Sequence, residues 1–311
     1  MSTKKYFIGV DGGSTKTEAV LIDENKKEMG RGLTAGSNAD IFGLSESVDR
    51  VFAAIEQACA GKNSNITGAC LAIAGIDTKK GKSIWEQAIK NHYSFSKYLN
   101  KKPFVVNDSL AALRSGTTAE NAIVIIAGTG SNCFGRNEKG EEAKSGGVDY
   151  ILSDEGSGYN IGLRILKRVT QSIDGRNDKT ILKDLLFRKL NISSFSKLVS
   201  QVYEKPWNKA DIASIAPLAE KAAEKEDKVA KEIIERAAHD LGIMIKAVAN
   251  KLQLKNKQYE IVTAGSVFNI QTILMIHLKE DIKQFSPKAI LVKPHIDSAT
   301  AAAYLAMEQT Q

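Results

Sequence analysis

The sequence is poor in cysteine and histidine, and the few that it has are widely scattered. It contains 311 residues with three cysteines, Cys59, Cys70 and Cys133, and no C-x-x-C motif. An odd number of cysteines at such spacing argues against disulfides and against structural zinc. The four histidines also lack the spacing of metal ligands; they are His92, His239, His277 and His295.

Long hydrophobic runs and basic runs interleaved with aromatic residues are missing as well. No apolar run approaches the ~20 residues that a membrane-spanning helix needs, and nucleic acid is not an expected partner. The residues before Tyr6 show no hydrophobic core of a signal peptide, so we expect a cytoplasmic protein. The net charge of +7 is spread over lysines beside glutamates, which is typical of a solvated surface.

The length and the pattern of the chain predict two domains. A single hydrophobic core tends to stop growing near about 250–300 residues. Strands and helices alternate over the first 116 residues, and a long helix-rich segment runs from 159 to about 254. We therefore expect an N-terminal α/β lobe over 1–116, a C-terminal α/β lobe with a helical insertion over 117–297, and a final helix over 298–311 that packs back at the lobe interface.

Two glycine turns, each between a pair of strands, carry the most information. An apolar strand leads into Asp11-Gly12-Gly13-Ser14-Thr15-Lys16-Thr17 and a second strand follows, and the arrangement recurs at Gly128-Thr129-Gly130-Ser131-Asn132. A single turn of this kind indicates only a β-hairpin, although its amides and hydroxyls can also bind an anion. The repeat, with a third small-residue turn at Ala264-Gly265-Ser266, favours a duplicated fold that holds a triphosphate.

The remaining elements are predicted from hydrophobic periodicity. Apolar residues spaced by three and four from Val229 to Leu252 predict one long buried helix. Val267 onward should also be helical. The other expected elements are helices over 45–60, 83–90, 270–285 and from Ser298, and strands over 68–74, 104–106 and 289–292.

A carboxylate stands where a strand ends and a helix begins, at Asn107-Asp108-Ser109. Ligands of open α/β sheets bind beyond the carboxyl ends of the strands. Asp108 is either only the N-cap of the helix or a general base that the helix dipole keeps ionised. Asn107 adds a neutral donor and acceptor that suit a hydroxylated substrate.

Two further polar segments suit sugar hydroxyls. The segment from Ser145 to Tyr159 is rich in glycine and acid, and one carboxylate accepts two hydroxyl hydrogen bonds at once. The simpler alternative is a loop with capping residues. Asn38, in a polar loop over 35–40, is by itself no more than a turn asparagine.

Together these motifs resemble, in order and over most of the chain, the N-acetylglucosamine kinases of the BadF/BadG/BcrA/BcrD ATPase group within the actin, sugar-kinase and Hsp70 superfamily. The resemblance implies a two-lobed, duplicated, ribonuclease H-like fold with ATP and Mg²⁺ in the interlobe cleft. It implies a 6-hydroxyl kinase of an amino sugar, with Asp108 as the base and Asp11 orienting Mg²⁺ through water. It leaves a homodimer open.

The resemblance also assigns roles to the other motif residues. Those expected at the nucleotide are Gly12, Gly13, Ser14, Thr15, Lys16, Gly128, Thr129, Ala213, Gly265 and Ser266. Those expected at the sugar are Asn38, Asn107, Asp108, Ser131, Asn132, Gly147, Val148, Asp149 and Asp154.

One departure from the family affects the sugar. The family usually has a Trp-Gly pair, often followed by His, after the double glycine, where this chain has Val148-Asp149-Tyr150. N-acetylglucosamine, N-acetylmuramic acid, glucosamine and other hexosamines all stay open as substrates. An inward-pointing Asp149 would oppose an anionic lactyl group and favour a free amine. A BadF-type activator ATPase is the alternative, but its iron–sulfur cluster needs paired thiolates, and no cysteine follows Cys133. A silent nucleotide-binding regulator is disfavoured by the retained Asp11 and Asp108.

Overall fold

The computed structural model describes residues 4–60, 66–76, 78–99, 101–204, 207–269 and 272–310. The chain divides into two compact units. The N-terminal unit comprises 1–118 with 294–311, and the C-terminal unit comprises 119–293. The last helix of the chain therefore belongs to the first unit.

The N-terminal unit is built on a mixed five-stranded sheet in the order β3-β2-β1-β4-β5. The first three strands form an antiparallel meander, and β4 and β5 continue the sheet parallel to β1. The strands are β1 (Tyr6–Gly12), β2 (Lys16–Asp23), β3 (Glu28–Ala35), β4 (Ile66–Ile73) and β5 (Phe104–Asn107). The helices are α1 (Ala39–Phe42), α2 (Leu44–Ala58), α3 (Lys79–Asn91), α4 (Phe95–Tyr98), α5 (Asp108–Arg114) and α14 (Ser298–Glu308).

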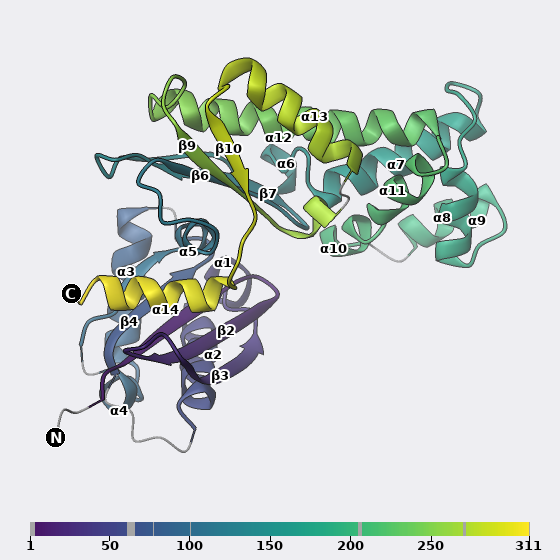
Figure 1. Cartoon of the computed structure of the whole chain (residues 1–311). Coiled ribbons are helices and arrows are strands. Elements are labelled where there is room, and N and C mark those ends of the chain that lie inside the picture. Colours follow the sequence, from purple (N-terminus) through teal and green to yellow (C-terminus); the bar gives the residue numbers. More distant parts are fainter. Residues whose placement is uncertain are drawn as a thin grey trace. The chain divides into compact units, whose positions relative to one another are not determined.

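Helices cover β1 from both faces, so β1 is a continuous apolar run rather than an alternating one. Ile8 and Val10 belong to the core that includes α2. At Gly9, α14 comes so close that a Cβ would lie 2.0 Å from the backbone nitrogen of Ala303. Figure 1 shows α14, in yellow, running along this sheet. A residue without a side chain is thus what allows the final helix to rest on the central strand.

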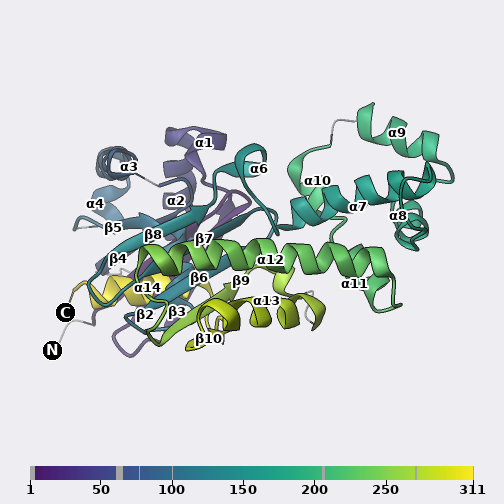
Figure 2. The same cartoon turned by 90° about the horizontal axis from the view of Figure 1, so that it is seen from above.

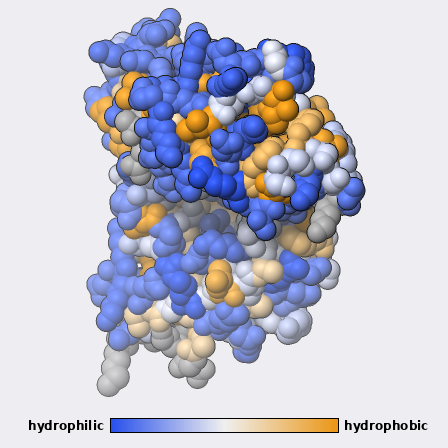
Figure 3. Space-filling view, turned by 90° about the vertical axis from the view of Figure 1, so that its right-hand side faces the viewer, coloured by the Kyte–Doolittle hydropathy of each residue, from blue (hydrophilic) through white to orange (hydrophobic). Residues whose placement is uncertain are grey.

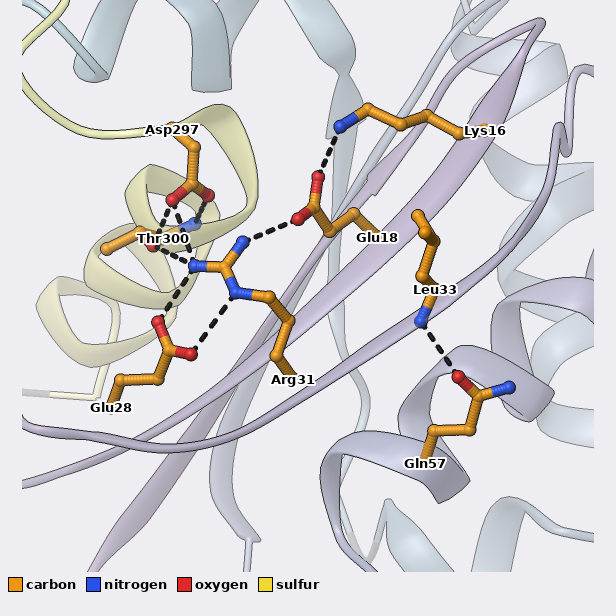
Figure 4. Close-up of polar contacts among 8 residues, drawn as sticks. All are labelled: Lys16, Glu18, Glu28, Arg31, Leu33, Gln57, Asp297 and Thr300. Carbon is orange, nitrogen blue, oxygen red and sulfur yellow. Dashed lines mark hydrogen bonds and ion pairs between the residues drawn. The ribbon is translucent and has the colours of Figure 1, made fainter.

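Arg31 on β3 ties the start of α14 to the first hairpin (Figure 4). Its guanidinium lies 2.6 Å from Glu18 Oε1 and 3.0 Å from Asp297 Oδ2. Asp297 in turn caps α14 by accepting a hydrogen bond from the Thr300 amide, and Glu18 also pairs with Lys16 at 2.6 Å. This chain of charges runs from the first glycine turn to the N-terminus of α14.

The C-terminal unit repeats the same topology. Its sheet has the order β10-β9-β6-β7-β8, in which β6, β7 and β8 form the antiparallel meander and β9 and β10 continue parallel to β6. The strands are β6 (Ala122–Ala127), β7 (Ser131–Arg136), β8 (Glu142–Gly146), β9 (Tyr259–Ala264) and β10 (Ala289–Val292). The two predicted hairpins, β1–β2 and β6–β7, are confirmed, and the repeated strand order supports the duplication.

Helices dominate the rest of this unit. The long helix α12 and its C-cap Leu252 bury every residue of the predicted stripe, and α12 lies beside α13 (Figure 2). The helices are α6 (Asp149–Leu152), α7 (Gly158–Ile173), α8 (Leu182–Leu190), α9 (Phe195–Tyr203), α10 (Lys209–Ala213), α11 (Pro217–Ala223), α12 (Lys228–Lys251), α13 (Thr272–Phe285) and the 3₁₀ turn η1 (Ser266–Asn269). Positions 270 and 271, where a helix was also predicted, lie outside the described residues.

Three details differ from the sequence predictions. Asn107, not Asp108, caps α5, because its side chain accepts the hydrogen bond from the Ser109 amide. The segment after Val267 is a 3₁₀ turn before α13 begins. The segment from Ser145, predicted as a loop, contains the end of β8 and the single turn α6.

All three cysteines are buried free thiols. No helix among the described residues has the length and hydropathy needed to cross a bilayer. The face drawn in Figure 3 is largely hydrophilic, with apolar side chains in small groups.

Candidate functional site

The first glycine turn is braced by the segment that follows β3. The amide of Ser37 donates to the Gly13 carbonyl at 2.9 Å, and the buried hydroxyls of Thr17 and Ser37 lie 2.8 Å apart. A Cβ on Gly36 would come within 2.3 Å of the Ser14 carbonyl oxygen. This close packing brings Asn38 to the turn, where its amide donates to Ser14 Oγ at 3.1 Å.

The exposed part of this turn is Ser14, Thr15 and Lys16. Gly13 closes it by donating its amide to the Lys16 carbonyl at 3.0 Å. The Lys16 ammonium is engaged by Glu18. The hydroxyls of Ser14 and Thr15 therefore lie at the surface of a turn whose backbone is fixed from beneath.

Two carboxylates flank the carboxyl edge of this sheet. The strand register places Gly12, Ile73 and Asn107 in one row across β1, β4 and β5, so Asp11 and Asp108 adjoin the ends of that row. Burial, and then the negative charge of Asp108, raise the pKa of Asp11 to about 7. A nearby cation would relieve this cost.

Asp108 owes its position to Asn107. The Asn107 side chain donates to the Ile76 carbonyl at 3.2 Å and accepts from the Ser109 amide at 3.0 Å. It therefore joins the segment after β4 to the start of α5. Asp108 becomes the first helical residue, where the helix dipole favours a negative charge.

The donors at this edge suit magnesium held together with a nucleotide. Among the residues that the structure describes, no group of three or more His, Cys, Asp or Glu side chains forms a metal site of its own. Mg²⁺ at phosphates typically uses only one or two protein carboxylates and keeps several waters. The half-buried Asp11 beside Asp108 fits that requirement.

The second glycine turn joins β6 to β7 and is closed by its own backbone. The Gly128 amide donates to the Gly130 carbonyl at 2.9 Å, and the Gly158 amide at the start of α7 donates to the Gly128 carbonyl at 2.8 Å. Ser157 caps α7 through the Asn160 amide. The turn is thereby fixed against the first turn of a helix.

A cavity of about 280 Å³ opens beside this turn. Four of the residues predicted at the nucleotide line it, namely Gly128, Thr129, Ala213 and Ser266. Its other lining residues are Gly158, Ala210, Ser214, Ala216, Pro217 and Val267. The structure thus brings together parts of the sequence that lie up to 139 positions apart.

Gly265 does not line the cavity, yet it shapes it. Its φ is +104°, and a Cβ there would lie 2.3 Å from the Ala127 carbonyl oxygen. The lack of a side chain at Gly265 thus allows the end of β9, which pairs with β6, to pass close to Ala127 just before Ser266, which lines the cavity.

The predicted sugar residues of this unit gather around Asp154. This carboxylate is only 3% exposed, and its Oδ1 accepts from the Ser131 amide at 2.8 Å. Its Oδ2 lies 2.5 Å from the ammonium of Lys209, which also pairs with Asp149 Oδ1 at 2.6 Å. No local sequence pattern marks this role of Lys209, because its two partners lie 55 and 60 positions away along the chain.

The remaining residues of that set surround the same loop. Gly147 packs on Asn132, since a Cβ there would lie 2.9 Å from Asn132 Cγ. The Ser131 hydroxyl donates to the Glu155 carbonyl, and Val148 is 58% exposed. Asn38, Asn107 and Asp108 belong to the N-terminal unit, so the predicted sugar set is divided between the two units.

Comparisons with known proteins agree with these motifs. The chain is 34% identical over 309 residues to an N-acetylmuramic acid/N-acetylglucosamine kinase of Clostridium acetobutylicum, covering 98% of this chain and 99% of that protein. It is 31% identical over 320 residues to an N-acetyl-D-glucosamine kinase of Dictyostelium discoideum, covering 98% of each. The crystal structure of a putative N-acetylglucosamine kinase from Chromobacterium violaceum superposes with a TM-score of 0.74 at 22% identity, covering 96% of this chain and 98% of that one.

The predicted fold class is confirmed, with two mixed sheets of the same strand order, as in the actin-like ATPase fold. Residues 8–306 match the BadF/BadG/BcrA/BcrD ATPase family. Because the match spans nearly the whole sequence, the chain belongs to the BadF/BadG/BcrA/BcrD ATPase family.

Proposed function

We propose that this protein is an ATP-dependent kinase that phosphorylates the 6-hydroxyl of an amino sugar, with N-acetylglucosamine as the first candidate and N-acetylmuramic acid and glucosamine as the others. The observation that carries the proposal is the pair Asp11 and Asp108 beside a hydroxyl-rich glycine turn. The kinases at 31–34% identity over the full chain support the class of reaction.

Asp108 acts as the general base in this proposal. The sugar oxygen attacks the γ-phosphorus, the new O–P bond forms as the bond to ADP breaks, and the hydroxyl proton passes to the Asp108 carboxylate. Since phosphoryl transfer depends mainly on positioning and electrostatics, the fixed start of α5 is as important as the basicity of the carboxylate.

The glycine turns bind phosphates, and the cavity beside Gly128 takes the nucleoside. Asp11 would hold Mg²⁺ through water, and the ion would neutralise charge on the phosphate oxygens. Asn38, Asn107 and Asp108 of one unit, and Ser131, Asn132, Gly147, Val148, Asp149 and Asp154 of the other, are assigned to the sugar. ATP is a cytoplasmic metabolite, so we place the reaction in the cytoplasm.

The alternative activator ATPase gains no support from the thiols. Cys59, Cys70 and Cys133 are all buried, and burial raises the pKa of the Cys70 and Cys133 thiols, which disfavours the thiolates that a cluster needs.

The test is ADP release by the purified protein with Mg-ATP and a panel of hexosamines, followed by NMR assignment of the phosphorylated position. Asp108→Asn, which keeps the size of the side chain, should lower kcat by at least about 10²-fold while ATP binding measured by calorimetry persists. Near-normal turnover of Asp108→Asn would refute the base. Absence of ADP release with every amino sugar would refute the kinase.

A further inference from the structure

Lys209 is held in place at the start of a short helix. It is the first residue of α10, and Asn208 and Asp211 form a reciprocal capping box around that start. The Lys209 side chain is 27% exposed, and its ammonium lies within 2.6 Å of both Asp149 Oδ1 and Asp154 Oδ2. The ammonium is therefore shared between two carboxylates that come from the same loop.

The shared ammonium also lies against the second glycine turn. A Cβ on Gly130 would meet Asp154 Oδ1 at 2.7 Å and Lys209 Nζ at 3.0 Å. On the next turn of the same helix, Ala213 and Ser214 line the cavity beside Gly128. One short helix thus contacts both the cavity beside Gly128 and the loop that carries Asp149 and Asp154.

The loop has an unusual backbone that needs support. Gly147, Asp149 and Asp154 all have positive φ, at +75°, +66° and +74°. For the two aspartates this conformation has a steric cost, and such residues persist when surrounding contacts hold them. The ion pairs with Lys209 supply that contact from outside the loop.

The cluster brings one ammonium to two aspartate side chains. Burial tends to lower the pKa of Lys209, but its pairing with the two aspartates raises it overall, and the hydrogen bond from Lys209 lowers the pKa of Asp149. The ammonium and the Asp149 carboxylate are therefore charged at neutral pH.

We propose that Lys209 is a specificity-determining residue that sets the net charge felt by the sugar at Asp154, and that it thereby allows neutral and anionic amino sugars to bind there. The inference rests on the proposed function, in which Asp154 contacts the sugar. Removing the ammonium makes the surroundings of Asp154 more negative by one charge, and removing the Asp149 carboxylate makes them less negative by one.

The experiment compares three sugars of different charge on the full-length protein. Glucosamine is cationic at pH 7, N-acetylglucosamine is neutral and N-acetylmuramic acid is anionic. The kcat/KM of each, or its inhibition constant against N-acetylglucosamine where it is not a substrate, is measured at low salt. Ratios to N-acetylglucosamine cancel any loss of active protein.

Lys209→Met should raise the glucosamine ratio by about tenfold and lower the N-acetylmuramic acid ratio by a similar factor, as expected for one charge at a partly desolvated site. Asp149→Asn should shift both ratios in the opposite direction, by about two- to threefold, because the Asp149 side chain is 66% exposed. Asparagine also tolerates the positive φ of this position. Lys209→Arg should keep both ratios near wild type, because it retains the charge.

The opposite signs separate a charge effect from a structural one. Lys209→Met and Asp149→Asn break the same ion pair, so a purely structural role would weaken all sugars in both variants and leave the ratios unchanged. Lys246→Met serves as a control, because it removes one charge from an exposed position on α12.

Unchanged ratios, or shifts of the same sign in both variants, would overturn the inference while the wild-type activity still supports the kinase. A wild-type protein that phosphorylates no amino sugar would overturn the proposed function and this inference with it.

Discussion

Gly9 is a position where a single methyl group should strongly destabilise the N-terminal unit. A Cβ there would lie 2.0 Å from Ala303 N, 2.3 Å from Ala299 O and 2.6 Å from Ala302 C. All three are backbone atoms of α14, so no side chain can rotate away. Non-bonded atoms pack at about 3.5–4.0 Å, and α14 must therefore recede from β1 by about 1.5 Å in Gly9→Ala.

The cost follows from what α14 buries. Ala299, Ala301, Ala302, Ala303 and Ala306 are each at most 1% exposed. A radial gap of about 1 Å already forfeits a quarter to a half of the dispersion energy of such contacts, and overpacking a core costs about 1–3 kcal/mol. We expect Gly9→Ala to lose about 3 kcal/mol, or about 6–12 °C of melting temperature for a unit of this size.

The assay is thermal unfolding by circular dichroism, with amide hydrogen exchange to locate the change. Exchange should accelerate in α14 and β1 and stay unchanged in the C-terminal unit. Gly81→Ala is the matched control, because it makes the same substitution in helix α3, where the nearest atom is a side-chain oxygen of Thr78 at 3.3 Å. Gly9→Ala melting within about 1 °C of this control, with α14 still protected, would refute the reasoning.

Three further predictions concern the charge chain and the nucleotide cavity. Arg31→Met should destabilise the N-terminal unit by about 1–2 kcal/mol in urea unfolding, a value reduced for the exposure of its partners; an unchanged midpoint would show that the ion pairs contribute nothing. Burial tends to raise the pKa of Asp297, but Arg31 and the Thr300 hydrogen bonds lower it overall. The contribution of ionised Asp297 to the free energy of unfolding is therefore complete above about pH 4. It is lost as the pH falls through the lower pKa of the folded state. Between about pH 5 and about pH 3, the wild type should therefore lose more free energy of unfolding than Arg31→Met does. Equal losses in the two proteins would contradict a stabilising ion pair between Arg31 and Asp297. Gly265→Ala, which combines a φ of +104° with a 2.3 Å contact to Ala127 O, should weaken ATP binding in calorimetry by at least about tenfold; unchanged affinity would show that this turn does not shape the nucleotide cavity.

Local sequence patterns predicted the parts of the fold that depend on residues close together in the sequence. The hairpins at Gly12 and Gly128 follow from apolar strands on both sides of a glycine turn, and both are confirmed. The stripe on α12 follows from spacing alone, because a 24-residue helix leaves little ambiguity of period. The motifs also identified the family, since their order along the chain is more specific than any one of them.

The features that could not be predicted depend on contacts between residues far apart in the sequence. Asn107 and Asp108 are both good N-caps by residue type; in the structure Asn107 caps α5, and its side chain also donates to Ile76, 31 positions away. The short turn α6 carries Asp149 at positive φ, and its support comes from Lys209, 60 positions away. The roles of the individual site residues stay predictions, which the variants above address.

The position of α14 has a consequence for folding during synthesis on the ribosome. The N-terminal unit uses residues 1–118 and then needs 294–311, so the whole C-terminal unit is synthesised before the first unit can be completed. Until Ala299–Ala306 leave the ribosome, one face of β1 and β4 lacks its cover. The N-terminal unit therefore stays incomplete, with apolar surface exposed, while the C-terminal unit folds as a continuous stretch of chain. A chain cut short before α14 retains every predicted active-site residue and still cannot finish the unit that carries Asp11 and Asp108.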